Sequence, residues 1–211
     1  MSQSLPFRLI LASGSPARRD LLRRAGYQFE VLPADIDEPT GAGYPDGRTL
    51  VEHTAWLKAA AVAPRVTADA DRPAVILTAD TVGWVGGRVI GKPADAADAR
   101  RILQRLMGTE HELWTGVCLW LRPHDLQIAW QEVSRVAMTP LGDAELDAYI
   151  ASGAWEGCSG AYAIQEEGDD PLVRVVTGSK TNVIGLPMEA LQEVLSGLAA
   201  NVDRFRRGGC P

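Results

Sequence analysis

The sequence predicts a mixed α/β (α+β) fold, with a central twisted mixed sheet flanked by helices. Short apolar runs bounded by turn residues alternate with segments of helical length, and two hairpin signals interrupt this alternation. The chain has 211 residues, which is enough for one full-sized domain with its own core. We expect a single domain over residues 1–200, arranged as two lobes around a cleft, and a flexible polar tail over residues 201–211.

The first part of the chain predicts a strand, a helix, a second strand and a long helix. Residues 7–12 (FRLILA) are apolar and precede a Ser/Gly/Pro turn, a pattern typical of a buried strand. Ser15 can cap the following helix with Pro16 at its first position, and Gly26 can end it. The next elements are a strand over 27–32, a Gly- and Pro-rich loop over 39–47, and an Ala-rich helix over 49–65.

The rest of the chain predicts two hairpins among further helices. Residues 74–79 (AVILTA) indicate a buried strand that ends at Asp80, and Gly86-Gly87 between apolar alternations indicates a hairpin. The second hairpin covers 111–121 and 127–138, with its turn at 123–125. The remaining elements are helices over 94–107, 142–152 and 187–198, a Gly-rich irregular segment over 153–168, and a strand over 172–176.

Composition excludes several classes of protein. No apolar run approaches the ~20 residues of a membrane helix, and the N-terminal apolar stretch lacks the basic region of a signal peptide. Cys118, Cys158 and Cys210 are far apart, so we expect no disulfide framework or zinc cluster and a reducing cytoplasm as the location. A net charge of −6 argues against binding to duplex nucleic acid but permits a small anionic ligand.

The turn between the first strand and helix is the first candidate site. Ser13-Gly14-Ser15-Pro16 offers backbone N–H groups and the positive end of a helix dipole, which suit a phosphate. Arg18 and Arg19 follow in the first helical turn, where the dipole disfavours cations. A bound anion would account for them. The alternative is a capped helix with solvated arginines.

Two charged residues later in the chain are also candidates. Asp80 follows the apolar strand, where a carboxylate can hold a divalent cation or deprotonate a water; it can equally be an ordinary turn residue. Lys92, between Gly91 and Pro93, can meet a phosphate as a point charge, or it is an ordinary exposed lysine.

Two loops complete the candidates. The acidic run from Asp35 to Glu38 suits a hard cation such as Mg²⁺, although a solvated acidic loop has the same pattern. The small residues that precede Gln165 would let the backbone approach a ligand closely, and the Gln165 amide suits a base edge. A tightly packed turn is the alternative for that segment.

Taken in order, these segments resemble the Maf family of nucleoside triphosphate pyrophosphatases, over about Leu9 to Leu191. The matching segments are LASGSPARRDLL, DIDEP, Lys58-Ala59, ADTVGWVGGRVIGKP, His111 with WTGV, SGAYAIQ and NVIGLP. The resemblance implies the Maf/inosine-triphosphatase-like fold. It also implies cleavage between the α- and β-phosphates of a nucleoside triphosphate, which gives a nucleoside monophosphate and pyrophosphate.

The resemblance also implies roles for individual residues. Asp80 takes the position of the proton acceptor, and with Glu38 it would hold the required divalent cation, Mg²⁺ or Mn²⁺. Thr81 and Gln165 take positions linked to base selection. The positions expected around the phosphates are Ser13, Arg18, Lys58 and Lys92.

Two positions depart from the common family pattern. Ala17 replaces the first of two arginines, at a position tied to substrate choice, and Cys158 replaces a lysine. The branch that acts on 7-methyl-GTP also tends to lose both basic residues, whereas Thr81 and Gln165 agree with the dTTP/UTP branch. Arg19 could compensate for part of the lost charge. We therefore expect dTTP, UTP or modified pyrimidine nucleotides as substrates, with 7-methyl-GTP as the alternative.

Two other classes remain as hypotheses. One is a nucleotide-binding regulator of septum formation with little catalysis, and the other is a transferase, which would need an acceptor. The expected partner is a nucleoside triphosphate, without nucleic acid or membrane. A homodimer is left open, because homodimers are frequent in the family that the chain resembles.

Overall fold

The computed structural model describes residues 4–164 and 170–207. Within them, one seven-stranded sheet has the order β2-β1-β3-β5-β6-β7, and β4 pairs with β3 at one end. The strands are β1 (Arg8–Leu11), β2 (Glu30–Val31), β3 (Ala74–Val85), β4 (Arg88–Ile90), β5 (Glu110–Arg122), β6 (Leu126–Met138) and β7 (Val173–Thr177). The β1–β2 and β1–β3 pairs are parallel and the other pairs are antiparallel, so the predicted mixed sheet is confirmed.

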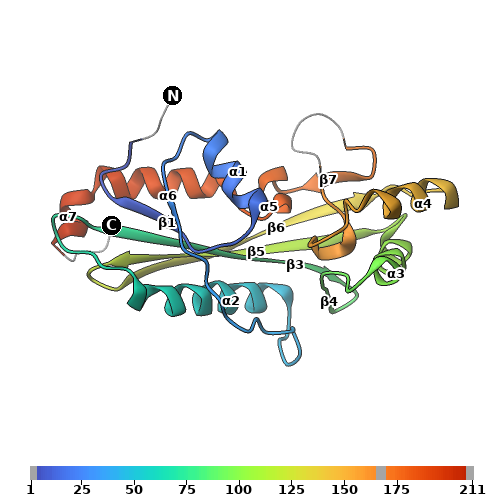
Figure 1. Cartoon of the computed structure of the whole chain (residues 1–211), viewed down its shortest axis with the longest axis horizontal. Coiled ribbons are helices and arrows are strands. Elements are labelled where there is room, and N and C mark those ends of the chain that lie inside the picture. Colours follow the sequence, from blue (N-terminus) through green and yellow to red (C-terminus); the bar gives the residue numbers. More distant parts are fainter. Residues whose placement is uncertain (1–3, 165–169, 208–211) are drawn as a thin grey trace.

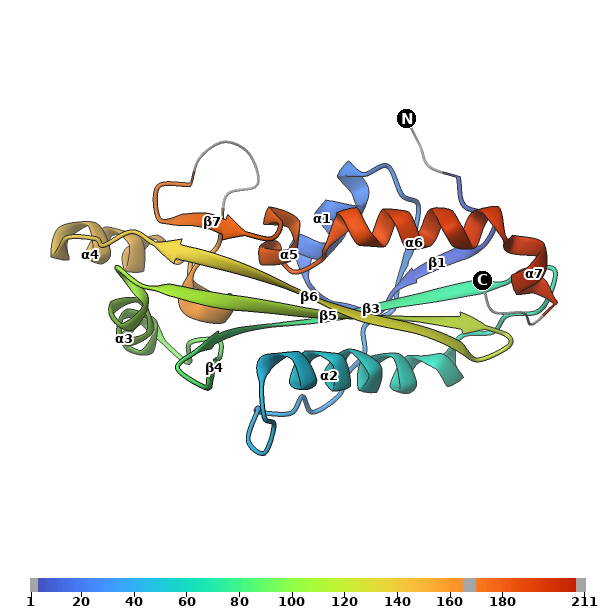
Figure 2. The same ribbon diagram turned by 180° about the vertical axis from the view of Figure 1, so that it is seen from behind.

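Helices cover both faces of this sheet (Figure 1). They are α1 (Pro16–Arg24), α2 (Gly47–Val62), α3 (Ala96–Leu106), α4 (Asp143–Ser152), α5 (Lys180–Ile184), α6 (Met188–Ala200) and α7 (Val202–Arg206), with 3-10 turns at Ala63–Arg65 and Ser159–Ala161. In both Figure 1 and Figure 2, α2 lies on one face, whereas α1, α5 and α6 lie on the other. Helices α3 and α4 lie at the end of the long strands near β4. None of the described helices is long and apolar enough to cross a membrane.

The third strand is longer than the sequence predicts. Asp80 was expected just beyond its end, but β3 continues to Val85, and Asp80 lies in its middle opposite Gly116 of β5. The reason is that β5 pairs with β3 along its whole length, from Ala74 to Trp84. This ladder keeps the polar Asp80-Thr81 pair in an extended strand, although the sequence alone suggests that the strand ends there.

Three further differences concern short elements. The strand expected over 27–32 is reduced to Glu30–Val31, which pairs with Ile10 and Leu11. Helix α5 was not predicted; it starts at the N-cap Ser179, whose side chain accepts from the backbone N–H of Asn182. The expected polar tail begins with helix α7. The other predicted helices and hairpin strands are confirmed to within a few residues.

Two main hydrophobic cores lie along the long strands. The first joins residues of β1, β3 and β5, such as Leu77 and Leu119, to α1 and α6. The second joins Leu113 of β5 and Val136 of β6 to α3, α4 and the Ser159–Ala161 turn. Both cores lie on one continuous sheet, and the two expected lobes with a cleft between them stay a prediction. The middle parts of β3 and β5 lie at the junction of the two cores.

Candidate active site

The position of α2 on the sheet places Lys58 above β3. Gly116 of β5 makes this possible, because a Cβ atom there would lie 2.4 Å from the Val51 carbonyl oxygen of α2. The fully buried Ala55 and Ala59 of α2 pack there against Cys118 of β5. The helix therefore lies close to the strands, and its long Lys58 side chain extends toward Asp80, the residue opposite Gly116.

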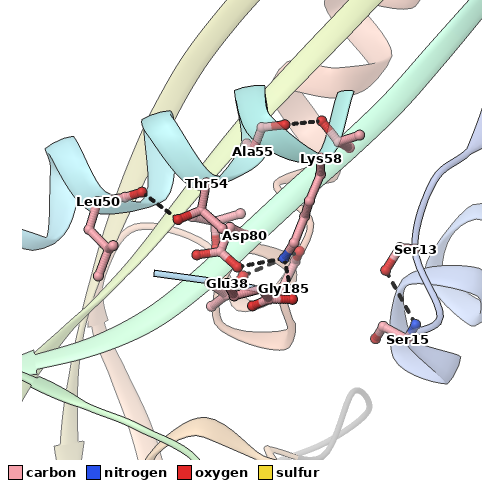
Figure 3. Close-up of polar contacts among 12 residues, drawn as sticks. Ser13, Ser15, Glu38, Leu50, Thr54, Ala55, Lys58, Asp80 and Gly185 are labelled. Atoms are coloured by element: carbon pink, nitrogen blue, oxygen red, sulfur yellow. Dashed lines mark hydrogen bonds and ion pairs between the residues drawn. The ribbon is translucent and has the colours of Figure 1, made fainter. Parts of the chain in front are cut away.

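Lys58 joins two carboxylates (Figure 3). Its Nζ atom donates to Asp80 Oδ1 at 2.8 Å and forms an ion pair with Glu38 Oε1 at 2.9 Å. The side chains of Lys58 and Asp80 are buried, whereas that of Glu38 is half exposed. Asp80 Oδ2 has no hydrogen-bond partner among the residues that the structure describes. One carboxylate oxygen of Asp80 is thus held and the other is available to a ligand or water.

Glu38 lies close to three positively charged side chains, which affect its pKa. Burial would raise the pKa of Glu38, but the nearby positive charges of Lys58, Lys92 and Arg18 together hold it below its ordinary value. Glu38 comes from the loop after β2, Lys58 from α2, and Lys92 from the loop after β4. The structure therefore brings residues from three distant segments to one charged cluster.

Arg18 of α1 is held beside this cluster by three bonds. Its Nε atom donates to the Gly185 carbonyl at 2.7 Å, Nη1 to Ser13 Oγ at 3.2 Å, and Nη2 to Thr81 Oγ1 at 3.1 Å. Desolvation lowers the pKa of Arg18, and the negative charges of Asp80 and Glu38 partly oppose that effect. A guanidinium has five N–H groups, so two remain for an anion.

The turn before α1 is built from its own serines. Ser13 Oγ accepts from the Ser15 N–H at 3.2 Å, and Ser15 Oγ accepts from the Arg18 N–H at 3.4 Å, which confirms Ser15 as the N-cap. Arg19 Nη2 donates to the Gly14 carbonyl at 3.4 Å, and Arg19 Nε is buried without a partner in the described residues. The serines thus order the turn and Arg18, while Arg19 keeps an unused donor.

Thr81, next to Asp80, belongs to a chain of hydroxyl groups. Thr81 Oγ1 lies 2.9 Å from Thr115 Oγ1 of β5, and Thr115 Oγ1 donates to the Asn182 carbonyl at 3.1 Å. Thr115 and Asn182 are fully buried. The Asn182 amide donates to the Leu113 carbonyl and to Ser134 Oγ, so α5 is tied to both β5 and β6.

A model of the family described as Maf-like protein matches residues 8–198. The chain belongs to the Maf family. It is 43% identical to the dTTP/UTP pyrophosphatase of Anaeromyxobacter dehalogenans over 97% of this chain and 95% of that protein. It is 37% identical to the dTTP/UTP pyrophosphatase of Rhodopirellula baltica over 95% of this chain and 86% of that protein. The corresponding protein of Pelotomaculum thermopropionicum is 38% identical, over 92% of this chain and 98% of its own length.

The positions at which this Maf chain departs from the family pattern lie at the edge of the cluster. Ala17 is in the first turn of α1, next to Arg18. Cys158 precedes the Ser159–Ala161 turn; burial raises the pKa of its thiol, and the charge of Lys92 acts in the opposite direction. This turn lies against β3 and the loop after β4, since Ser159 Oγ donates to the Thr81 carbonyl. Gln165 lies outside the described residues.

Asp80 and Glu38 form a donor set that suits a hard divalent cation. Each carboxylate contacts the Lys58 ammonium through one oxygen, so Asp80 Oδ2 and Glu38 Oε2 are the oxygens left for a cation. Mg²⁺ is commonly bound by one or two carboxylates together with substrate phosphates and water. The described residues hold no group of three or more His, Cys, Asp or Glu that could bind a metal. A cation bound by these two carboxylates would therefore need its remaining ligands from the substrate and solvent.

Three residues of this Maf site were missed by sequence reasoning. Thr115 and Asn182 lie within the WTGV and NVIGLP segments, and Gly185 lies in the second of these, but no role was derived for any of them. Gly185 has φ +121°, and a Cβ atom there would lie 3.4 Å from Thr81 Oγ1 and 3.5 Å from Arg18 Nε. A polar residue inside an apolar strand was the available signal for Thr115.

Proposed function

We propose that this chain hydrolyses the α–β phosphoanhydride of dTTP and UTP to the nucleoside monophosphate and pyrophosphate. The observation that carries the proposal is the Lys58–Asp80–Glu38 cluster beside Arg18, in a chain 37–43% identical, over nearly its whole length, to proteins named dTTP/UTP pyrophosphatase. Those names favour dTTP and UTP over 7-methyl-GTP as substrates.

In the proposed mechanism Asp80 is the general base. Its free Oδ2 takes a proton from the water that attacks the α-phosphorus, while Oδ1 stays bonded to Lys58. The bond from the α-phosphorus to the bridging oxygen then breaks, and pyrophosphate leaves with the electron pair. The Lys58 bond fixes the direction of the carboxylate, which is what a positioned base requires.

The cations around Asp80 serve the phosphates. Arg18 is pre-positioned by Ser13, Thr81 and the Gly185 carbonyl, and its two remaining N–H groups can bind phosphoryl oxygens without further ordering of the side chain. Lys92 is exposed and can reach the more distant phosphates as a point charge. Together with Arg19 it can replace part of the charge that Ala17 and Cys158 do not supply.

Asp80 and Glu38 would hold the divalent cation, Mg²⁺ or Mn²⁺, that we propose as the cofactor. When bound, such an ion neutralises charge on the phosphoryl group. We also propose the cytoplasm as the location, because Cys118 and Cys158 are both free thiols, as expected in a reducing compartment.

The test is pyrophosphate release from a panel of triphosphates in the presence of Mg²⁺ or Mn²⁺. The panel contains dTTP, UTP, dCTP, CTP, GTP and 7-methyl-GTP. The proposal expects dTTP and UTP to have the highest kcat/KM. A higher kcat/KM for 7-methyl-GTP would reject the substrate assignment, and binding without turnover for every nucleotide would instead support a regulator.

A further inference from the structure

The Thr115 hydroxyl is committed to one acceptor. Its Oγ1 atom lies 3.1 Å from the backbone carbonyl of Asn182, and a carbonyl can only accept. A threonine hydroxyl has a single proton, so the Thr115 proton is used in this bond. The contact between Thr115 Oγ1 and Thr81 Oγ1, at 2.9 Å, must then be one in which Thr81 donates.

This assignment also consumes the proton of Thr81. The other acceptor in reach of Thr81 Oγ1 is the Gly185 carbonyl, but at 3.5 Å it is much farther away than Thr115 Oγ1 at 2.9 Å, so the Thr81 proton goes to Thr115. Thr81 accepts a bond from Arg18 Nη2 at 3.1 Å on one of its two lone pairs. The second lone pair remains, so Thr81 can offer a ligand an acceptor but no donor.

Asn182, whose backbone carbonyl accepts the Thr115 proton, is itself held in place by hydrogen bonds. The Asn182 amide donates to the Leu113 carbonyl at 3.2 Å and to Ser134 Oγ at 2.9 Å. The backbone carbonyl of Asn182 also accepts from the Gly185 N–H at 3.0 Å. This carbonyl therefore keeps a partner when the Thr115 hydroxyl is removed, and the change need not leave a buried group unpaired.

We propose that Thr115 is a positioning residue that sets base selectivity by fixing the Thr81 hydroxyl as a hydrogen-bond acceptor. The inference rests on the proposed function and on the position of Thr81, which the family resemblance links to base selection. Uracil and thymine carry a hydrogen on N3 and can donate to such an acceptor, whereas N3 of cytosine is itself an acceptor. Thr81 in its fixed orientation therefore matches uracil and thymine and opposes cytosine.

The test compares Thr115→Val with Thr115→Ser and with Thr78→Val. Valine removes the hydroxyl and frees the Thr81 proton to point at the base, whereas serine keeps the hydroxyl. Thr78 is the matched control, because it is also a fully buried threonine on the β3–β5 pair. Within the described residues, its hydroxyl bonds only to the Ala55 and Cys118 carbonyls and not to Thr81. The quantity measured is the ratio of kcat/KM for dTTP to kcat/KM for dCTP, and likewise for UTP and CTP.

We expect Thr115→Val to lower this ratio about fivefold or more, the effect of one lost neutral hydrogen bond of ~1 kcal/mol. Thr115→Ser is expected to keep the ratio within about twofold of the unmodified protein, as is Thr78→Val. Thermal unfolding of each variant identifies any that do not fold; if Thr115→Val does not, Thr115→Ala removes the same hydroxyl and takes its place.

An unchanged ratio in a folded Thr115→Val protein that still hydrolyses dTTP would overturn the inference. An equal loss of selectivity in Thr115→Ser or Thr78→Val would also overturn the inference, because the loss would then not be due to removal of the Thr115 hydroxyl. If the unmodified protein does not hydrolyse dTTP or UTP, the proposed function fails instead, and the two failures are thereby distinguished.

Discussion

Lys58 Nζ lies 2.8 Å from Asp80 Oδ1, and both side chains are buried where α2 packs on the middle of β3. The same ammonium contacts Glu38 Oε1 at 2.9 Å, so one cation separates two carboxylates from distant segments. Replacing one member of a buried ion pair leaves the other charge without compensation, which is costly. This arrangement makes the charge balance of the cluster directly testable.

Asp80→Asn is expected to remove most of the activity while the protein stays folded, because Lys58 keeps its ion pair with Glu38. Asparagine has nearly the same shape as aspartate but cannot take a proton from water, so kcat should fall by about 10²–10⁴-fold. Steady-state kinetics with dTTP measure the loss, and circular dichroism checks the fold. Asp20→Asn is the control, since Asp20 is exposed on α1 and pairs with Arg23. Near-normal turnover by Asp80→Asn would remove Asp80 from the role of base.

Lys58→Met is expected to raise the pKa of Glu38. Lys58 is the strongest of the nearby charges that hold this pKa below its ordinary value, and Lys92 is a weaker one. Carboxyl chemical shifts followed by NMR during a pH titration measure the change. Lys92→Met is the matched control and should produce a smaller rise. An equal rise in the pKa of Glu38 in both variants would contradict the direct contact between Lys58 and Glu38.

Gly185→Ala is expected to weaken the site and the fold together. At φ +121° an L-residue is strained, at a cost of about 1–3 kcal/mol, and the added methyl group contacts Arg18 and Thr81. The free energy of unfolding should fall by that amount and KM for dTTP should rise. Gly197→Ala, in α6 where a Cβ atom meets open space, should instead stabilise by about 0.5–1 kcal/mol. A Gly185→Ala protein as stable as the unmodified one would show that the backbone at Gly185 does not require a glycine.

His111 is expected to make the fold sensitive to acid. Burial lowers the pKa of His111 to about 4, and its Nε2 atom lies 2.7 Å from the Tyr162 hydroxyl. The unfolded chain takes up a proton near the ordinary value of 6.5, and the folded protein only near 4. Stability is therefore fully present above pH 6.5 and is lost as the pH falls toward 4, at ~1.4 kcal/mol per pH unit.

Urea unfolding at pH 7 and pH 5 measures this loss. The unmodified protein should lose about 2 kcal/mol more than His111→Gln over that interval, because the other titrating groups are shared by both proteins. Equal losses in the two proteins would show that His111 does not carry the pH dependence.

Most of the fold follows from local signals in the sequence. The cap formed by Ser15, the turn at Gly86-Gly87 and the alternation along β5 and β6 each predict their element without reference to the rest of the chain. The extension of β3 past Asp80 could not be predicted in this way. It depends on pairing with β5, more than 30 residues away in the sequence.

The site was less accessible to local reasoning than the fold. Glu38, Lys58 and Asp80 each have an ordinary structural explanation when taken alone, and their convergence depends on how closely α2 packs over Gly116. Thr115 appears in the sequence as one polar residue in an apolar strand. Its bond to the Asn182 carbonyl arises only from tertiary contact.

The continuity of β3 and β5 through both cores has a mechanical consequence. No flexible linker separates the two cores at Asp80 and Thr115. Each of these residues lies within an unbroken strand, and the residues before and after it in that strand are paired with a neighbouring strand. Rotation of one core against the other would therefore have to twist the paired strands, and no hinge is present in β3 or β5 at these positions. Asp80, the proposed general base, therefore lies in a continuously paired part of the sheet, and any rearrangement around it would have to come from the loops that carry Glu38 and Lys92.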